Sequence, residues 1–207
     1  MRGKFITFEG CEGAGKSTQI KLLSKYLEEQ GIPFVLTREP GGNEISEKIR
    51  NIILDSKNSN MGDECEALLY AASRAQNLID FVLPHLEKGE LVICDRFTDS
   101  SLAYQGYARN LGFDFIEKIN SFAIEKFTPD LTLFFNINPK DAFLRKGGAD
   151  KGDRLEQMGL AFHEKVYEGY LKLLEKYPNR IKAVDCSKDR FTTSKNIIDL
   201  LKKEKII

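Results

Sequence analysis

Short runs of apolar residues alternate along the chain with longer stretches in which apolar residues recur at helical spacing. Runs at about 4–9, 34–36, 91–94, 131–135 and 181–184 predict β-strands. The run at 91–94 is apolar throughout, which is typical of a strand buried on both faces of a parallel sheet. We therefore expect an α/β protein whose parallel sheet is covered by helices on both faces.

The stretches between these strands have the periodicity of amphipathic helices. We expect helices in five main places: from about Gly15 to Gly31, from Asn43 onward, from 63 to about 88, from 154 to 176, and from 191 to 204. In the helix that Asn43 opens, four isoleucines should face the core: Ile45, Ile49, Ile52 and Ile53. No repeat or long linker divides the chain, so residues 1–207 should form a single domain.

The longest predicted helix has two distinct faces. Asp63 and Glu66 resemble a capping pair at its start. One apolar stripe is expected to face the core: Leu68, Ala72, Ala75, Ile79, Val82 and Leu86. Tyr70, Arg74 and Asn77 lie roughly 180–240° around the helix from this stripe, on the face turned from the core. Such a face is able to stack on a base and hydrogen-bond its edge, although an exposed Tyr beside a cation is the simpler interpretation.

A complete G-x-x-x-x-G-K-[ST] loop follows the first predicted strand directly and consists of Gly10, Cys11, Glu12, Gly13, Ala14, Gly15, Lys16, Ser17 and Thr18. Between a strand and a helix, the backbone N–H groups of this loop form a cradle for nucleotide phosphates. Lys16 is expected to reach the β- and γ-phosphates, and the Ser17 hydroxyl to hold Mg²⁺. Asp95 ends a buried strand at the same edge of the sheet and is a second candidate magnesium ligand, or else a helix cap.

Three other segments carry candidate phosphate-binding cations, two of them at strand ends and one between two predicted helices. Arg38 ends the second strand, where it either binds phosphate or pairs with Glu39 at the surface. Arg96 precedes a segment, 97–106, that is dense in hydrogen-bonding side chains and therefore suits either a ligand-lining or a polar surface helix. Residues 145–154 contain three glycines and four cations, which favours a lid over phosphates rather than a simple exposed loop.

Composition excludes several other classes of protein. The chain has 31 Lys and Arg against 31 Asp and Glu, which disfavours a nucleic-acid partner. None of the four cysteines forms a C-x-x-C pair, which disfavours a zinc site or a disulfide framework. No apolar stretch approaches the roughly 18 residues of a membrane span. The first apolar run is too short for a signal peptide, so we expect a cytoplasmic protein without a membrane partner.

Taken together, in this order and spacing, motifs along nearly the whole chain resemble thymidylate kinases of the bacterial type. They are Phe8-Glu9-Gly10, residues 37–42, Leu68-Leu69-Tyr70 with Arg74, Asp95-Arg96-Phe97, residues 103–106 and residues 153–156. The resemblance implies a P-loop kinase fold with a five-stranded parallel sheet and a lid. It also implies ATP with Mg²⁺ as the donor, dTMP as the acceptor and a homodimer.

The resemblance implies a role for each residue of the acceptor site. Arg38 and Arg96 are expected to bind the monophosphate of dTMP. The Tyr70 ring is expected to stack on thymine, where family members more often carry Phe. The implied site is completed by residues that contact the base or lie under the deoxyribose: Arg74, Ser101 and Gln105 at the base, and Tyr104 under the sugar.

The catalytic cations are expected to come from the loop and the lid. Lys16, Mg²⁺ and Arg96 would offset the repulsion between two polyanions. Glu12 is the acidic loop residue that the family places near the sugar or the metal. Gly13 stands where the eukaryotic type carries a catalytic arginine, so the resemblance assigns that work to Arg154 and also to Arg145. A kinase for another pyrimidine nucleotide or nucleoside, and a regulatory ATPase, stay open as alternatives.

Overall fold

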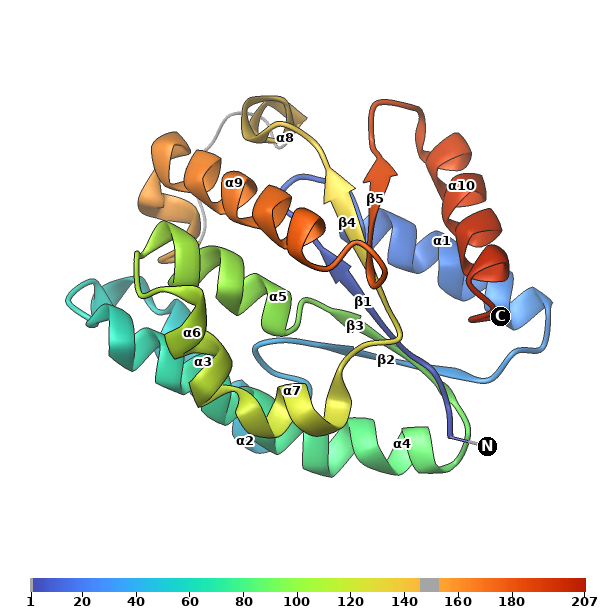
Figure 1. Ribbon diagram of the computed structural model, residues 1–207, viewed down its shortest axis with the longest axis horizontal. Helices are drawn as coiled ribbons and strands as arrows, with labels where there is room; N and C mark the ends of the chain where they lie inside the picture. The colour runs from blue at the N-terminus through green and yellow to red at the C-terminus, as the bar shows by residue number, and fades with distance from the viewer. Residues whose placement is uncertain (1, 146–152) are drawn as a thin grey trace.

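Five parallel strands form one sheet in the order β2-β3-β1-β4-β5 in a computed structural model that describes residues 2–145 and 153–207 (Figure 1). The strands are β1 (Phe5–Glu9), β2 (Phe34–Arg38), β3 (Leu91–Asp95), β4 (Leu131–Asn136) and β5 (Ile181–Asp185). The α/β class and the five-stranded parallel sheet are thus confirmed. Of the lid predicted at 145–154, residues 146–152 lie outside the described residues.

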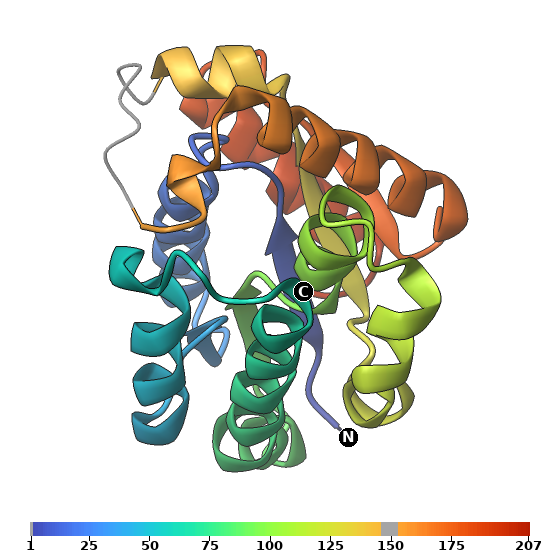
Figure 2. The same cartoon turned by 90° about the vertical axis from the view of Figure 1, so that its left-hand side faces the viewer.

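Helices cover both faces of the sheet (Figures 1 and 2). One face packs against α1 (Lys16–Glu29) and α10 (Arg190–Lys203). The other faces α9 (Leu160–Lys176) and a π-helical segment, Leu102–Ala108. The remaining helices are α2 (Glu44–Leu54), α3 (Asp63–Asn77), α4 (Leu83–Glu87), α5 (Thr98–Ser101), α6 (Phe113–Ile119), α7 (Ser121–Phe127), α8 (Pro139–Arg145), a π-helical turn (Leu78–Val82), and 3-10 turns at Ser56–Asn58 and Glu156–Met158.

Alternation along β1 positions the chemistry of the site. Ile6 and Phe8 belong to the core beneath α1 and α10. Phe5, Thr7 and Glu9 point to the opposite face, because successive side chains of a strand alternate. All five residues of β1 are buried, so this strand brings a carboxylate, that of Glu9, into the interior.

The prediction for the isoleucines of α2 was half wrong. Asn43 caps this helix as expected, since its Oδ1 accepts a hydrogen bond of 2.9 Å from the Ser46 amide. Ile53 is buried, but Ile45 and Ile52 are each 49% exposed. The helical periodicity was interpreted correctly, whereas the buried arc of α2 is narrower than the isoleucines suggested.

The orientation predicted for α3 was wrong over most of its length. Leu68 and Ile79, from the supposed core stripe, are 52% and 48% exposed, while Arg74 and Asn77 are fully buried. The interior beside α3 is polar, and its groups need partners that an apolar stripe does not provide. The π-helical turn that follows α3 shifts the helical phase, so Val82 is buried as expected.

Two helix starts also differ from prediction. Gly62 occupies the N-cap position of α3 without a side-chain hydrogen bond, and Glu66 points into the interior instead of back to the helix end. The helix predicted from residue 154 begins only at Leu160. It follows a 3-10 turn and Gly159, whose φ of 79° favours glycine and interrupts the helix.

Candidate active site

The glycine-rich loop lies at the carboxyl ends of the strands, where β1 meets α1. Residues 12–18 line a crevice of about 300 Å³ together with Asp95, Arg96 and Arg145. We call this space the donor crevice. Gly13 has a φ of 77°, and a Cβ there would come within 2.4 Å of the Ala142 carbonyl oxygen, so only glycine fits.

Lys16 and Asp95 bring opposite charges into the donor crevice. Lys16 Nζ donates to the carbonyl oxygens of Gly10 and Cys11 at 3.2 Å each. Burial, and secondarily the nearby Arg96 guanidinium, lower the pKa of Lys16. Asp95 Oδ1 is buried and has no hydrogen-bond partner among the described residues. A buried oxygen of this kind is suited to a cation.

A second pocket adjoins the donor crevice, and we call it the acceptor pocket. It is lined by six of the seven predicted substrate residues: Tyr70, Arg74, Arg96, Ser101, Tyr104 and Gln105. Glu12 and Arg96 line both spaces, so the two are adjacent. The predicted donor and acceptor sites are therefore neighbours in the fold.

Arg96 stands at the boundary between the two spaces in a strained backbone conformation, with a φ of 72°. Its Nη2 donates to Glu12 Oε1 at 2.5 Å, and its Nη1 donates to Ser100 Oγ at 3.2 Å. The guanidinium lies 5.2 Å from the centre of the Tyr104 ring. These contacts hold one cation where donor and acceptor phosphates would meet.

Glu9 is a buried residue of the site to which the sequence analysis gave no role. Its Oε1 accepts from the Phe97 amide at 2.7 Å, and its Oε2 accepts from Ser100 Oγ at 2.6 Å and from the Tyr170 hydroxyl at 2.8 Å. Burial, and then the neighbouring Asp99, raise the pKa of Glu9 to about 7. Glu9 thus fixes the backbone after Arg96 and the two hydroxyls that Arg96 Nη1 contacts, those of Ser100 and Tyr170.

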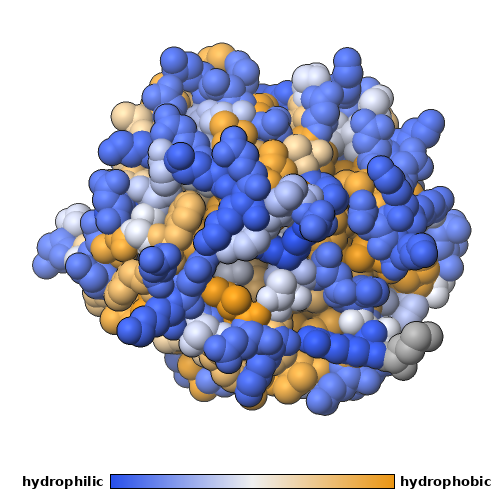
Figure 3. All heavy atoms as spheres, in the orientation of Figure 1, coloured by the Kyte–Doolittle hydropathy of each residue, from blue (hydrophilic) through white to orange (hydrophobic). Residues whose placement is uncertain are grey.

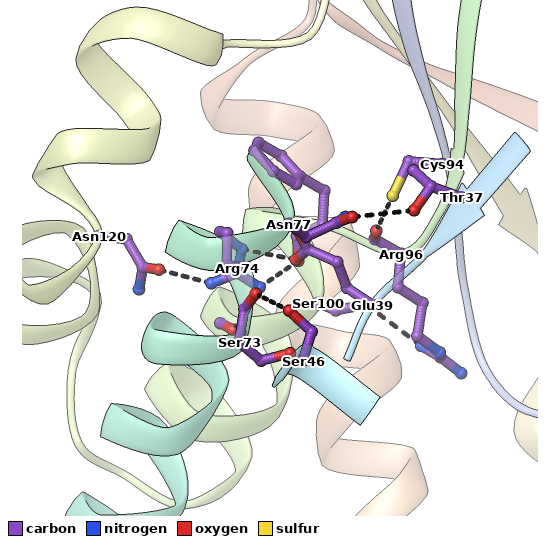
Figure 4. Close-up of polar contacts among 12 residues, drawn as sticks. Thr37, Glu39, Ser46, Ser73, Arg74, Asn77, Cys94, Arg96, Ser100 and Asn120 are labelled. Atoms are coloured by element: carbon purple, nitrogen blue, oxygen red, sulfur yellow. Dashed lines mark hydrogen bonds and ion pairs between the residues drawn. The ribbon is translucent and has the colours of Figure 1, made fainter. Parts of the chain in front are cut away.

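Arg74 is held by a buried network (Figure 4). Its Nε donates to Glu39 Oε2 at 2.7 Å, and its Nη1 donates to Asn120 Oδ1 at 2.5 Å. Its Nη2 donates to the Phe97 carbonyl oxygen and to Ser101 Oγ, both at 3.1 Å. These contacts use four of the five N–H donors of a guanidinium, so Arg74 organises the pocket wall as well as lining it.

Arg38 is the predicted substrate residue that the structure does not bring to the acceptor pocket. Its Nη2 donates to both carboxylate oxygens of Glu47 at 2.9 Å. Arg50 lines the pocket in its place and donates from Nη1 to the Pro40 carbonyl oxygen at 2.8 Å. Nothing in the local sequence around Arg50 marks it, because its role depends on how α2 packs.

The two arginines predicted for catalysis occupy different surroundings. Arg145 lines the donor crevice and donates from Nη2 to the Cys186 carbonyl oxygen at 2.8 Å. Arg154 is buried, donates from Nε to the Ile53 carbonyl oxygen at 2.9 Å, and forms an ion pair with Glu66. The structure therefore brings Arg145 to the phosphate cradle and holds Arg154 at the end of α2.

A phosphate cradle that shares an arginine with a second pocket, at the carboxyl edge of a parallel sheet, defines the class of P-loop phosphotransferases. A family model described as thymidylate kinase matches residues 8–197. The chain belongs to the thymidylate kinase family, which confirms the resemblance found in the sequence.

Individual relatives agree over nearly the full length. The chain is 53% identical to the thymidylate kinase of Clostridium novyi (strain NT) over 188 residues, which covers 90% of this chain and 92% of that protein. It is 46% identical to the thymidylate kinase of Thermoanaerobacter sp. (strain X514), covering 98% and 99%. The crystal structure of thymidylate kinase from Ehrlichia chaffeensis matches with a TM-score of 0.78 at 31% identity, covering 98% of this chain and 99% of that one. Within the described residues, no helix is both long and apolar enough to cross a membrane.

Proposed function

We propose that the protein transfers the γ-phosphoryl group of ATP directly to the 5′-phosphate of dTMP, giving dTDP and ADP. Membership of the thymidylate kinase family supports the reaction, the donor and the acceptor. The single observation that carries the residue assignments is that Arg96 and Glu12 line both the donor crevice and the acceptor pocket. We further propose that the reaction takes place in the cytoplasm, as the sequence analysis expects.

The chemistry follows from the two adjoining spaces. An oxygen of the dTMP phosphate attacks the γ-phosphorus, and the bond from that phosphorus to the ADP oxygen breaks. The acceptor is already anionic, so a strong general base is unnecessary. The main barrier is the approach of two polyanions, which Lys16 on the donor side and Arg96 between the substrates offset. Arg145 and Arg154 are the further cations proposed for the transferring group.

Mg²⁺ fits the residues of the donor crevice. Asp95 Oδ1 is buried without a hydrogen-bond partner among the described residues, and Ser17 lines the same crevice. We assign these two side chains to the ion. When bound, Mg²⁺ would neutralise charge on the β- and γ-phosphates.

The acceptor pocket supports recognition of a deoxynucleotide. The Tyr104 hydroxyl is buried and has no hydrogen-bond partner among the described residues, although Tyr104 lines the pocket. We assign this ring to the deoxyribose and the Tyr70 ring to the base. Arg74, Ser101 and Gln105 supply the polar edge that the base requires. Arg38 is proposed to bind the monophosphate after exchanging Glu47 for it.

We also propose a homodimer, which would cover exposed apolar side chains of α2, α3 and the turn that follows α3. Four side chains are each about half exposed: Ile45 and Ile52 on α2, Leu68 on α3, and Ile79 on the π-helical turn after α3. Figure 3 shows hydrophobic surface among polar side chains along the lower edge of the molecule, where Figure 1 draws α2, α7 and α4. Exposed apolar surface of this extent is typical of an interface between subunits.

The dimer is tested by light scattering after size exclusion. The wild-type protein should elute at twice the chain mass, and Leu68→Glu should dissociate it because a carboxylate is costly in an apolar interface. Leu144→Glu, at a side chain that is 75% exposed on α8, is the matched control and should stay dimeric. A monomeric wild-type protein at micromolar concentration contradicts the proposal.

An ADP-release assay over a panel of acceptors tests the reaction itself. With ATP as the donor, dTMP should give the highest kcat/KM among dTMP, dUMP, dCMP and thymidine. Preference for thymidine would make the protein a nucleoside kinase. ADP release that is independent of every acceptor would make it an ATPase.

A further inference from the structure

The carboxylate of Glu66 links the acceptor pocket to Arg154. Glu66 lies in the first turn of α3 and is fully buried. Its Oε1 accepts a hydrogen bond of 2.8 Å from Gln105 Nε2, and its Oε2 forms the ion pair with Arg154 Nη2. One carboxylate is therefore divided between a residue that lines the acceptor pocket and an arginine proposed to act on the donor phosphates.

Arg109 is a second cationic partner of Glu66. Its Nη2 lies 2.9 Å from Glu66 Oε2. It is also fixed by Asp63 Oδ1 at 3.3 Å and by the Phe162 ring, whose centre lies 5.1 Å from the guanidinium. Breaking a buried ion pair is costly mainly when it leaves a charge without compensation. Arg109 would therefore leave Glu66 a cationic partner if Arg154 exchanged Glu66 for a phosphate.

The other contacts of Arg154 are weaker than a phosphate contact. Its Nε donates to the neutral Ile53 carbonyl oxygen, and its Nη2 lies 3.8 Å from Met61 Sδ. Charge-assisted hydrogen bonds to phosphate are stronger than either of these. Glu66 is thus the partner that competes with the ATP phosphates for Arg154.

We propose that Glu66 is a positioning residue that keeps Arg154 off the ATP phosphates while the acceptor pocket is empty and yields it when dTMP engages Gln105. This inference rests on the proposed function. It gives the enzyme a means of suppressing ATP hydrolysis without an acceptor, since water is the competing nucleophile. Gln105 and Arg154 would be coupled because each contacts a different oxygen of the Glu66 carboxylate.

The first test compares ATP hydrolysis with phosphoryl transfer in Glu66→Gln, which keeps size and a hydrogen-bond acceptor but loses the charge. Without dTMP, ATP hydrolysis should rise about tenfold, while kcat with dTMP should change less than about twofold. Asp63→Asn removes the other carboxylate on Arg109 and should alter neither rate. Loss of both rates together with a lower thermal midpoint indicates a structural role only and overturns the proposal.

The second test uses the wild-type protein and needs no catalysis. The ¹⁵N NMR signal of Arg154 Nε, assigned with Arg154→Lys, should shift when dTMP alone is added and should not shift with inorganic phosphate alone. An unchanged signal at saturating dTMP overturns the proposal, and so does an equal shift with inorganic phosphate. If the wild-type protein phosphorylates dTMP while the signal stays unchanged, only this inference fails. If dTMP is not phosphorylated, the proposed function fails as well.

Discussion

The donor crevice and the acceptor pocket are built in opposite ways. One continuous stretch, residues 12–18, supplies most of the donor crevice, and its shape depends on the backbone of glycines such as Gly13. The acceptor pocket instead gathers side chains from segments spread between Glu12 and His163. Its walls are held by buried ion pairs, such as that between Arg74 and Glu39.

Because of this difference, substitutions in the donor crevice should mainly lower activity, whereas substitutions in the acceptor pocket should also lower stability. A cradle made by local backbone keeps its shape when a side chain in it is removed, so losses there should fall on the rate of the reaction. A pocket held by buried charges couples substrate binding to folding, because removing one partner leaves the other uncompensated. The expected effects below follow this distinction in order of decreasing size.

Lys16→Met should lower kcat about a thousandfold, because it removes the ammonium group proposed to hold the donor phosphates. The fold should persist, since Lys16 makes hydrogen bonds only to carbonyl oxygens of its own loop in the described structure. Steady-state kinetics and a thermal melt on the same sample measure both effects. A melting temperature that falls by more than about 5 °C would show that Lys16 also stabilises the fold, which contradicts the difference drawn between the donor crevice and the acceptor pocket.

Arg74→Met should destabilise the protein by about 3–5 kcal/mol, because Glu39 and Asn120 lose a buried partner. The KM for dTMP should rise while the KM for ATP stays nearly constant. Urea unfolding and kinetics with each substrate varied are the measurements. Arg38→Met is the control for the unfolding measurement alone, since its ion pair with Glu47 is half exposed and contributes less than about 1 kcal/mol.

Arg154→Ala should lower kcat about a hundredfold and change the KM for ATP less than about threefold, because its contact with the transferring group is strongest in the transition state. Arg145→Ala should act mainly on the KM for ATP, since this side chain already lines the donor crevice. Equal kcat in Arg154→Ala and the wild type removes Arg154 from the mechanism.

Glu9 should make stability depend on pH. Its pKa in the folded protein, raised by burial to about 7, exceeds its ordinary value of 4.5, so the folded state binds the extra proton between these values. The contribution to stability is therefore complete below about pH 4.5 and is lost as the pH rises through about 7. Glu9→Gln should reduce this pH-dependent loss in the free energy of unfolding by about 1–3 kcal/mol between pH 5 and 8. Urea unfolding at pH 5 and at pH 8 measures the free energy of unfolding of both proteins. An equal change in that free energy between the two pH values in the variant and the wild type contradicts the assignment.

The sequence was informative where structure depends on local pattern and less so where it depends on packing. The strands and the phosphate loop followed from apolar runs and glycine spacing, which act over a few residues. The orientation of α3 was predicted wrongly, because the interior beside this helix is polar, with Arg74 and Asn77 buried in it, and helical periodicity alone does not say which face turns inward. The partners of Glu66 and Arg74 lie far along the chain, at Arg109, Arg154 and Asn120, so no local signal revealed them.

The stereochemistry of transfer tests the central claim, that ATP and dTMP meet across Arg96 and react directly. The measurement uses ATP made chiral at the γ-phosphorus with oxygen isotopes and determines the configuration of the phosphoryl group in dTDP. Direct in-line transfer between the two adjoining spaces predicts inversion. Retention would require an intermediate phosphorylated on the protein and would contradict the account.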